Sequence, residues 1–209
     1  MQRKGLGILL VLCLLACAFT LAMSAADSTA AYTEIGTPEA LISLMTRANG
    51  ESWAGNYRLT ADITLPAGTA QNPIGNSTDK FTGIFDGNGK TVSGVNLVDE
   101  ATASGTNAFI GFFGYVQGGE IRNLTLKGTV STTGRRAGGF IGAINGSAKV
   151  EDCINYCSVG AFANAGGIVG FVSPSAGVTI SGCKNYGAIT GTTAANTGTG
   201  GIIGSTGTS

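Results

Sequence analysis

The sequence predicts an all-β protein in which parallel strands form a β-solenoid, also called a parallel β-helix, and three observations lead to this fold class. Glycine supplies 35 of the 209 residues and charged residues only 11%, which is typical of short strands joined by tight turns. A hydrophobic content of 43% is sufficient for a core and excludes the disordered class. Glycine and apolar positions recur every 28–30 residues, a period that suits one rung, meaning one full turn, of a parallel solenoid.

Residues 1–26 are predicted to be a secretory signal peptide, so the fold begins after them. Two basic residues precede an apolar run from Leu6 to Met23, and small residues near the end of the run suit cleavage. An uncleaved membrane anchor and a lipoprotein signal at Cys17 are the alternatives. We therefore expect a secreted or cell-surface protein, which contacts a membrane only through this segment if it stays uncleaved.

Residues 27–50 are predicted to be a lead-in that contains one short amphipathic helix. Thr37 suits the N-cap and Pro38 the first helical position, and the acid Glu39 faces the positive end of the helix dipole. Apolar residues at 41–45 form a stripe of about three helical turns that ends at Asn49-Gly50. Because the first rung of a solenoid has an unpaired strand edge, we expect this helix to cap it.

Residues 51–209 are predicted to form about five rungs, because three columns of residues repeat along them. The first column is a glycine that opens a Gly-x-x-Gly-like motif, at spacings of 28, 28, 28 and 34 residues. The predicted columns are Gly83, Gly111, Gly139, Gly167 and Gly201; Val92, Ile121, Val150 and Ile180, with Ile63 as a fainter earlier copy; and Val130, Val159 and Ile189. The six extra residues of the last spacing (34 − 28) are assigned to a surface loop at Thr192 to Thr199.

The motifs also resemble a known family. The cores GFFG, GFIG, GIVG and GIIG, with following segments such as IRNLTL and ISGCKNYGAI, resemble GLUG-motif repeats, and FTGIFDGNGKTVSGV resembles the N-terminal part of such domains. The resemblance covers residues 32–209. It implies a right-handed parallel β-helix from a large bacterial surface or secreted protein, such as an adhesin-like protein or a non-catalytic region of an immunoglobulin A peptidase. It supplies no catalytic residues.

The stretch GIFDGNGKTV, from Gly83 to Val92, is predicted to be a strand, a corner and the start of the next strand. A phosphate-binding loop would need glycine in place of Ile84 and a helix after the loop, and the following residues are strand-like. A calcium loop would need more oxygen ligands than Asp86 and Asn88 supply. The Asp-Gly and Asn-Gly dipeptides favour a turn, so the corner is placed at 86–90.

A carbohydrate-active β-helix is the main enzymatic alternative, because such chemistry needs clustered carboxylates. The acids are scattered: Asp62 and Asp86 are expected in turns of neighbouring rungs, and Asp99-Glu100 and Glu151-Asp152 are adjacent residues whose side chains point to opposite faces of a strand. The basic pair Arg135-Arg136 is interpreted as a solvated turn, with contact to an anionic glycan as the alternative. We predict no catalytic, cofactor-binding or metal-binding residue and no cofactor.

Three cysteines follow the predicted signal peptide, and without histidine they cannot form a zinc site. Cys153 and Cys183 share a column with Leu124, so they are expected to point inward and touch, either as small buried side chains or as a disulfide between rungs. Cys157 falls at a bend, in the column of Gly128 and Gly187.

Two further columns follow the cysteines. Asn155 and Asn185 are spaced so that their amides can exchange hydrogen bonds along the solenoid. Tyr156 and Tyr186 stack beside them, either as ordinary packing or as an outward aromatic strip for sugar binding.

The predicted function is that of a non-enzymatic surface scaffold or adhesin-like module, which presents loops and side-chain ladders to a surface glycan or protein with avidity from repetition. The alternatives are the carbohydrate-active β-helix and an accessory region of a larger surface protease. With 12 basic and 12 acidic residues the chain has no basic field, so no nucleic-acid partner is expected. The chain stops inside a rung at residues 202–209, from which we expect a fragment of a longer protein.

Overall fold

The computed structural model describes residues 31–48, 50–69, 71–99, 108–191 and 198–207. The predicted signal peptide at 1–26, the acid Glu100 and most of the predicted loop at 192–199 lie outside these residues. The fold described below is the compact unit that begins at Thr33.

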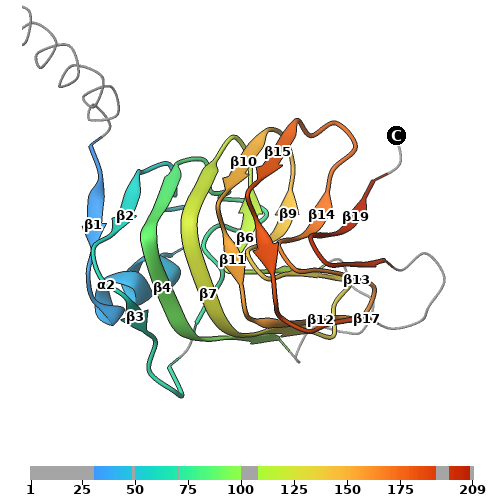
Figure 1. The fold of residues 1–209 in the computed structure, drawn as a ribbon. Coiled ribbons are helices and arrows are strands. Elements are labelled where there is room, and N and C mark those ends of the chain that lie inside the picture. Colours follow the sequence, from blue (N-terminus) through green and yellow to red (C-terminus); the bar gives the residue numbers. More distant parts are fainter. Residues whose placement is uncertain (1–30, 49, 70, 100–107, 192–197, 208–209) are drawn as a thin grey trace, which may run out of the picture. The chain divides into compact units, whose positions relative to one another are not determined.

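Mostly short strands and one short helix make up this unit, as the glycine-rich composition predicts, although two strands extend over 16 and 13 residues (Figure 1). The strands and the helix are β1 (Thr33–Ile35), α2 (Pro38–Met45), β2 (Tyr57–Leu59), β3 (Ile63–Thr64), β4 (Ile84–Asp99), β5 (Phe109–Ile110), β6 (Phe113–Val116), β7 (Glu120–Thr132), β8 (Arg136–Gly138), β9 (Ile141–Ile144), β10 (Ala148–Glu151), β11 (Ile154–Asn155), β12 (Ser158–Ala161), β13 (Asn164–Gly166), β14 (Val169–Val172), β15 (Val178–Ser181), β16 (Lys184–Asn185), β17 (Ile189–Gly191), β18 (Thr199–Gly200) and β19 (Ile203–Thr206).

The strands form a parallel β-solenoid of about four turns, which confirms the predicted class with slightly fewer rungs than expected. Three parallel sheets run along it. The largest follows the order β1-β2-β4-β7-β10-β15, and the other two follow β18-β13-β8-β5 and β19-β14-β9-β6. Strand neighbours in each sheet are one rung apart in the sequence, and Figure 1 shows β4, β7 and the later strands stacked side by side.

The Gly-x-x-Gly column is confirmed in its last four members and wrong in its first. Phe113 pairs with Ile141, Ile141 with Val169, and Val169 with Ile203, each at the third position of its motif. Gly83 does not belong there: its carbonyl accepts a hydrogen bond from the amide of Glu120 at 2.9 Å. The preceding residue that pairs with Phe113 is Ile74, through an isolated bridge.

The second column contains a related error. Ile121, Val150 and Ile180 do stack, but the residue before them in the column is Phe85 and not Val92. The spacing from Phe85 to Ile121 is 36 residues (121 − 85), whereas the next two spacings are 29 and 30. Because that rung is longer, a constant period matched the wrong positions.

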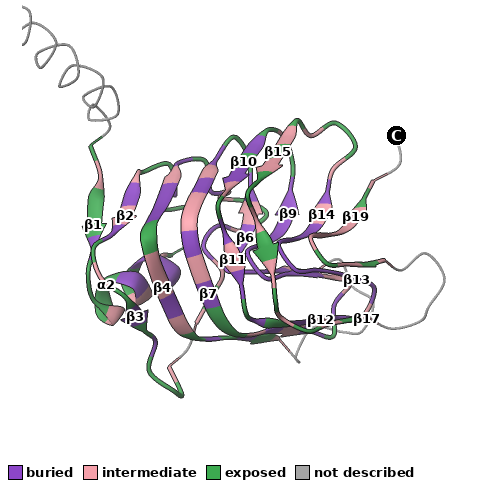
Figure 2. Cartoon of the chain, viewed as in Figure 1, coloured by how far each residue is buried: buried purple, intermediate pink, exposed green. Residues whose placement is uncertain are grey.

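The core consists of buried apolar side chains from all three sheets. Figure 2 shows the buried residues as bands that alternate with more exposed ones along the strands. The largest fully buried rings are Phe81, Phe85, Phe112, Phe113 and Phe140. Phe85 meets Phe113 edge to face, with ring centroids 5.4 Å apart and an interplanar angle of 76°. The third column, Val130, Val159 and Ile189, is confirmed as part of this interior.

Helix α2 begins as its sequence predicts and is shorter than predicted. The hydroxyl of Thr37 accepts a hydrogen bond from the amide of Ala40 at 3.2 Å, which satisfies one of the free amides at the N-terminus. The helix ends at Met45 after 8 residues. Leu41 and Leu44 are buried, and the Leu44 carbonyl accepts a hydrogen bond from the Trp53 indole at 3.1 Å. Over the part of the chain that the structure describes, no helix has the length and apolarity to cross a membrane.

The predicted corner in GIFDGNGKTV is present as a bulge inside one continuous strand. Asn88 and Gly89 have φ values of 51° and 71°, and the pairing of β4 with β7 shifts register between Asp86 and Lys90. The strand therefore bends without ending.

The leading glycines of the repeat are required by the backbone and the side chains of the following turn. A Cβ added at Gly139 would collide with the carbonyl of Gly167 and lie 2.7 Å from the amide carbon of Asn155, and one at Gly167 would collide with the carbonyl of Gly201 and the amide carbon of Asn185. At Gly201, in the same column, nothing lies within 4 Å of an added Cβ. The close stacking of the turns, including the asparagine column, thus excludes a side chain at Gly139 and Gly167.

We expect Gly167→Ala to lower the free energy of unfolding by about 2 kcal/mol, because the new methyl group overpacks a closed site. The matched control is Gly201→Ala, for which we expect a change within about 0.5 kcal/mol. Urea denaturation followed by circular dichroism measures both. Equal losses for the two variants would contradict the closed packing around Gly167.

Candidate functional site

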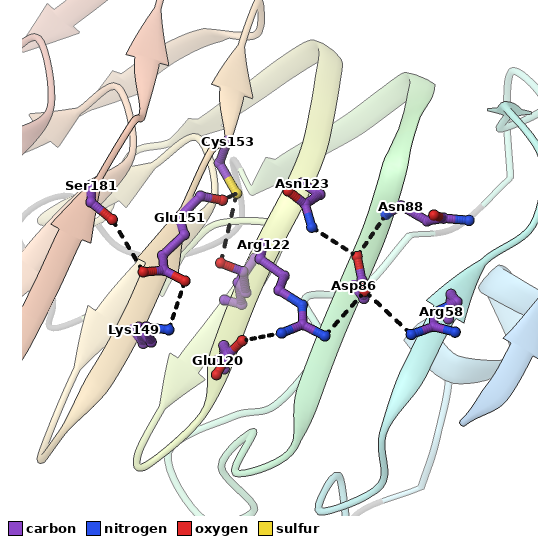
Figure 3. Close-up of polar contacts among 11 residues, drawn as sticks. Arg58, Asp86, Asn88, Glu120, Arg122, Asn123, Lys149, Glu151, Cys153 and Ser181 are labelled. Atoms are coloured by element: carbon purple, nitrogen blue, oxygen red, sulfur yellow. Dashed lines mark hydrogen bonds and ion pairs between the residues drawn. The ribbon is translucent and has the colours of Figure 1, made fainter. Parts of the chain in front are cut away.

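A chain of charged side chains crosses three rungs on the largest sheet (Figure 3). Arg58 on β2, Asp86 on β4 and Arg122 on β7 are in register. The Asp86 carboxylate lies 3.6 Å from a guanidinium nitrogen of Arg58 and 3.2 Å from one of Arg122. Arg122 also pairs with Glu120 at 2.8 Å.

Asp86 opens the predicted corner, and its carboxylate is also held by two guanidinium groups that the sequence does not indicate. Its side chain is buried, and its Oδ1 accepts hydrogen bonds from the amide of Asn88 at 2.8 Å and from the side chain of Asn123 at 3.2 Å. Arg58 and Arg122 could not be predicted as its partners, because their partnership with Asp86 is visible only once the strands are in the correct register.

The other acids of the enzymatic alternative are also dispersed. Asp62 accepts a hydrogen bond from the amide of Thr91 at 2.8 Å, and Asp99 accepts one from the hydroxyl of Thr132 at 3.4 Å. Glu151 pairs with Lys149 at 2.7 Å, and this hydrogen bond lowers the pKa of Glu151 and raises that of Lys149. Within the described ranges, no three acidic or thiol side chains are grouped so that they could hold a metal ion.

The basic pair Arg135-Arg136 is only in part the turn that the sequence predicts. Arg135 lies in the bend before β8 and is partly exposed, whereas Arg136 lies in β8. The guanidinium carbon of Arg136 is 4.0 Å from the ring centroid of Phe171 and 4.9 Å from that of Phe109. Burial and, to a smaller extent, the neighbouring charge of Arg135 lower the pKa of Arg136. Its cation therefore packs against two aromatic rings.

The predicted asparagine pair is confirmed as a buried ladder. The Asn155 amide donates a hydrogen bond to the Asn185 amide oxygen at 2.8 Å. Each side chain also bonds its own backbone two residues on: Asn155 to Cys157, at 3.0 Å in both directions, and Asn185 to Gly187 at 3.1 and 3.2 Å. This column satisfies buried polar groups and is structural.

The cysteines occupy the predicted columns as free thiols. Cys153 is buried and Cys183 is half-buried, one rung apart. Cys157 is buried between the backbones of its neighbouring rungs, and burial raises its pKa to about 12.

The predicted tyrosine pair forms an exposed strip on the outer surface. Tyr156 and Tyr186 are 47% and 61% exposed, yet their rings stack with centroids 5.1 Å apart at an interplanar angle of 20°. On the preceding rung, the ammonium of Lys127 lies 5.6 Å from the centroid of Tyr156. One cation and two aromatic rings thus follow each other along the solenoid, and we call this set the tyrosine strip.

A groove of about 480 Å³ lies on the segments that follow the tyrosine strip in sequence. Ser158 lines it, two residues beyond Tyr156 and past a bend at Cys157. The side chains that line the groove with hydroxyl groups are Thr129, Ser131, Thr132, Thr133, Ser158 and Thr190. These residues do not stand out in the sequence, since serine and threonine are frequent throughout the chain.

Comparisons with known proteins cover only part of the chain. An alignment of 128 residues, which covers 46% of the chain, is 36% identical to halomucin of Haloquadratum walsbyi. An alignment of 100 residues, which covers 44% of the chain, is 32% identical to a putative Gly-rich membrane protein of Evansella cellulosilytica. The matches span 1% and 11% of the lengths of these two relatives. No family model matches the chain. No solved structure matches it either.

We expect Asp86→Ala to lower the free energy of unfolding by roughly 2–4 kcal/mol, because it leaves two partly buried guanidinium groups without their shared carboxylate. Asp62→Ala is the control, since Asp62 is exposed and accepts one surface hydrogen bond; its expected loss is about 1 kcal/mol or less. Chemical denaturation of both variants tests this, and equal losses would argue against a structural role specific to Asp86.

Proposed function

We propose that this chain is an exported, non-enzymatic scaffold module of a bacterial surface protein, adhesin-like, and that its tyrosine strip binds a surface glycan. In this proposal residues 1–26 direct export, the solenoid is right-handed and of the GLUG-repeat type, and helix α2 caps its first rung. The buried face of α2 and the hydrogen bond from Trp53 to Leu44 support the capping role.

The exposure of the tyrosine strip is the observation that carries the proposal. Large rings exposed to water lose the stabilisation that burial would supply, and Tyr156 and Tyr186 nonetheless stand outward in a fixed, stacked arrangement. A sugar ring has an apolar face of C–H groups that packs on an aromatic ring, and hydroxyl groups at its rim that need hydrogen-bond partners. Tyrosine meets both needs because it joins a flat apolar ring to a polar tip.

The groove beyond the bend at Cys157 supports the same ligand class. Its hydroxyl groups can donate and accept hydrogen bonds, which suits the hydroxyl groups of a saccharide. Lys127 at the end of the strip would favour a glycan that carries carboxylate or sulfate groups near the first ring. Because the strip follows successive rungs, a polysaccharide would lie along the solenoid, and several weak contacts would add by avidity.

The arrangement of the acids supports binding rather than catalysis. A polysaccharide lyase or hydrolase needs carboxylates that face the substrate together. Here Asp86 is paired with Arg58 and Arg122, and Glu120 is paired with the same Arg122. No contact of the described residues favours the carbohydrate-active or the protease-accessory alternative.

The relatives support a surface location. One is named as a putative membrane protein and both are far longer than the chain, which fits a module that forms a small part of a large surface protein. The adhesive role itself rests on the tyrosine strip and not on these names.

We expect the double variant Tyr156→Ala/Tyr186→Ala to bind its glycan at least tenfold more weakly, because each stacking ring contributes about 1 kcal/mol or more. Affinity electrophoresis against a panel of soluble neutral and uronic-acid polysaccharides identifies a ligand for the unaltered chain and then compares the variants. Val98→Ala is the control, as Val98 is an exposed apolar side chain outside the strip. Unchanged binding in the double variant would refute the proposed site.

The enzymatic alternative has its own test. We expect Asp62→Ala and Glu120→Ala to leave polysaccharide binding within about twofold, since neither residue lies in the strip. Incubation of the unaltered chain with pectin-like substrates and calcium should release no unsaturated sugars, measured by ultraviolet absorbance. Release that depends on calcium and is lost in either variant would replace the scaffold function with a lyase.

A further inference from the structure

Cys153 and Cys183 lie directly one above the other on successive rungs. The residues that follow them, Ile154 and Lys184, are paired partners of β11 and β16. Neighbouring parallel strands are about 4.8 Å apart, and this separation lies within the Cα–Cα range of about 4.4–6.8 Å that a disulfide spans. The backbone therefore places the Cα atoms of the two cysteines within the range that a disulfide spans.

Both sulfurs lean toward the preceding rung. The Cys183 Sγ lies 3.5 Å from the carbonyl oxygen of Val150, in the rung that carries Cys153, and the Cys153 Sγ lies 3.8 Å from the carbonyl oxygen of Ile121. The proximity of the other thiol is the main cause that lowers the pKa of Cys183 to about 7 and raises that of Cys153.

Cys157 lacks a comparable neighbour among the described residues. Its paired positions on the adjacent rungs are Gly128 and Gly187, because Ser158 pairs with Thr129 and an added Cβ at Gly187 would collide with the Cys157 carbonyl. The geometry thus selects one pair out of the three thiols of the solenoid.

We propose that Cys153 and Cys183 are a covalent modification site, at which an oxidising environment joins two successive rungs by a disulfide. Cys183 is the half-buried partner and meets the oxidant, whereas the buried Cys153 completes the bond. This inference does not depend on the proposed glycan binding, since neither sulfur belongs to the tyrosine strip.

The reaction balances with a low-molecular-weight disulfide as the oxidant. The Cys183 thiolate attacks one sulfur of that disulfide, forms a mixed disulfide and releases one small thiolate. The thiolate takes up the proton of Cys153, and the Cys153 sulfur then attacks Cys183 and releases the second small thiol. Two protein thiols are oxidised to one disulfide, and one small disulfide is reduced to two thiols.

Peptide mapping of the full chain tests the site. Trypsin cleaves after Lys149 and Lys184, so that peptide 150–184 contains all three solenoid cysteines, whereas Cys13 and Cys17 fall in another peptide. The purified chain is equilibrated with oxidised glutathione, unfolded in denaturant and labelled there with one alkylating reagent, so that buried free thiols also react. It is then reduced under denaturing conditions and labelled with a second reagent before mass spectrometry.

We expect Cys157 to carry the first label and Cys153 and Cys183 the second, and the unreduced peptide to be lighter by two hydrogens. Cys157→Ser should leave this result unchanged, whereas Cys153→Ser should leave Cys183 with glutathione or the first label. The inference is overturned if all three cysteines take the first label, or if the bond joins Cys157.

Thermal unfolding provides a second readout. A disulfide that closes a loop of about 30 residues restricts the unfolded chain, so we expect oxidation to raise Tm by roughly 5–10 °C. Reduction should abolish the increase, and Cys183→Ser should not show it although its reduced form folds normally. An equal increase in Cys183→Ser would mean that oxidation acts elsewhere.

Discussion

Parallel stacking of the rungs at one strand spacing is the constraint on which the rest of the structure depends. Each side chain meets the side chain at the same position of the next rung, about 4.8 Å away. Residues of one kind therefore form columns, and the members of each column must supply one another's packing, hydrogen-bond or charge partners. Phenylalanine and aliphatic columns fill the interior, the asparagine column exchanges amide hydrogen bonds, and charged columns alternate in sign, as in Arg58, Asp86 and Arg122.

The columns are also coupled to one another across the interior. Asn155 and Asn185 occupy space that a Cβ at Gly139 or Gly167 would need. The glycines of the repeated motif thus leave room both for the backbone of the following turn and for the asparagine side chains. The same coupling holds at Asp86, whose position in the bulged strand β4 lets it bond to Asn88 of its own rung and Asn123 of the next. Polar residues such as Asp86 and Asn155, which could belong to a binding or catalytic site, therefore contribute to the stability of the fold.

Side chains that point outward do not need packing or hydrogen-bond partners inside the solenoid, and the tyrosine strip is the clearest case. Tyr156 and Tyr186 neither fill the core nor satisfy a buried group: they stack on each other, Lys127 lies over the Tyr156 ring, and both rings stay exposed to solvent. A repeated scaffold suits weak ligands, because each added rung extends the same surface in the same direction. The stability of the rungs and the chemistry of the surface are thus divided between the two faces of each strand.

The sequence by itself determined the fold class and the columns of the later rungs. The pairs Asn155 with Asn185, Tyr156 with Tyr186 and Cys153 with Cys183 are all 30 residues apart, and no insertion lies between their segments. Only the tertiary structure decided the earlier register. The rung from Phe85 to Ile121 has 36 residues, so counting by a constant period misplaced Gly83 and Val92 and concealed the partners of Asp86. Rungs stack by backbone hydrogen bonds and buried side chains and tolerate loops of different lengths, so the spacing in sequence follows the register only where the loops are equal.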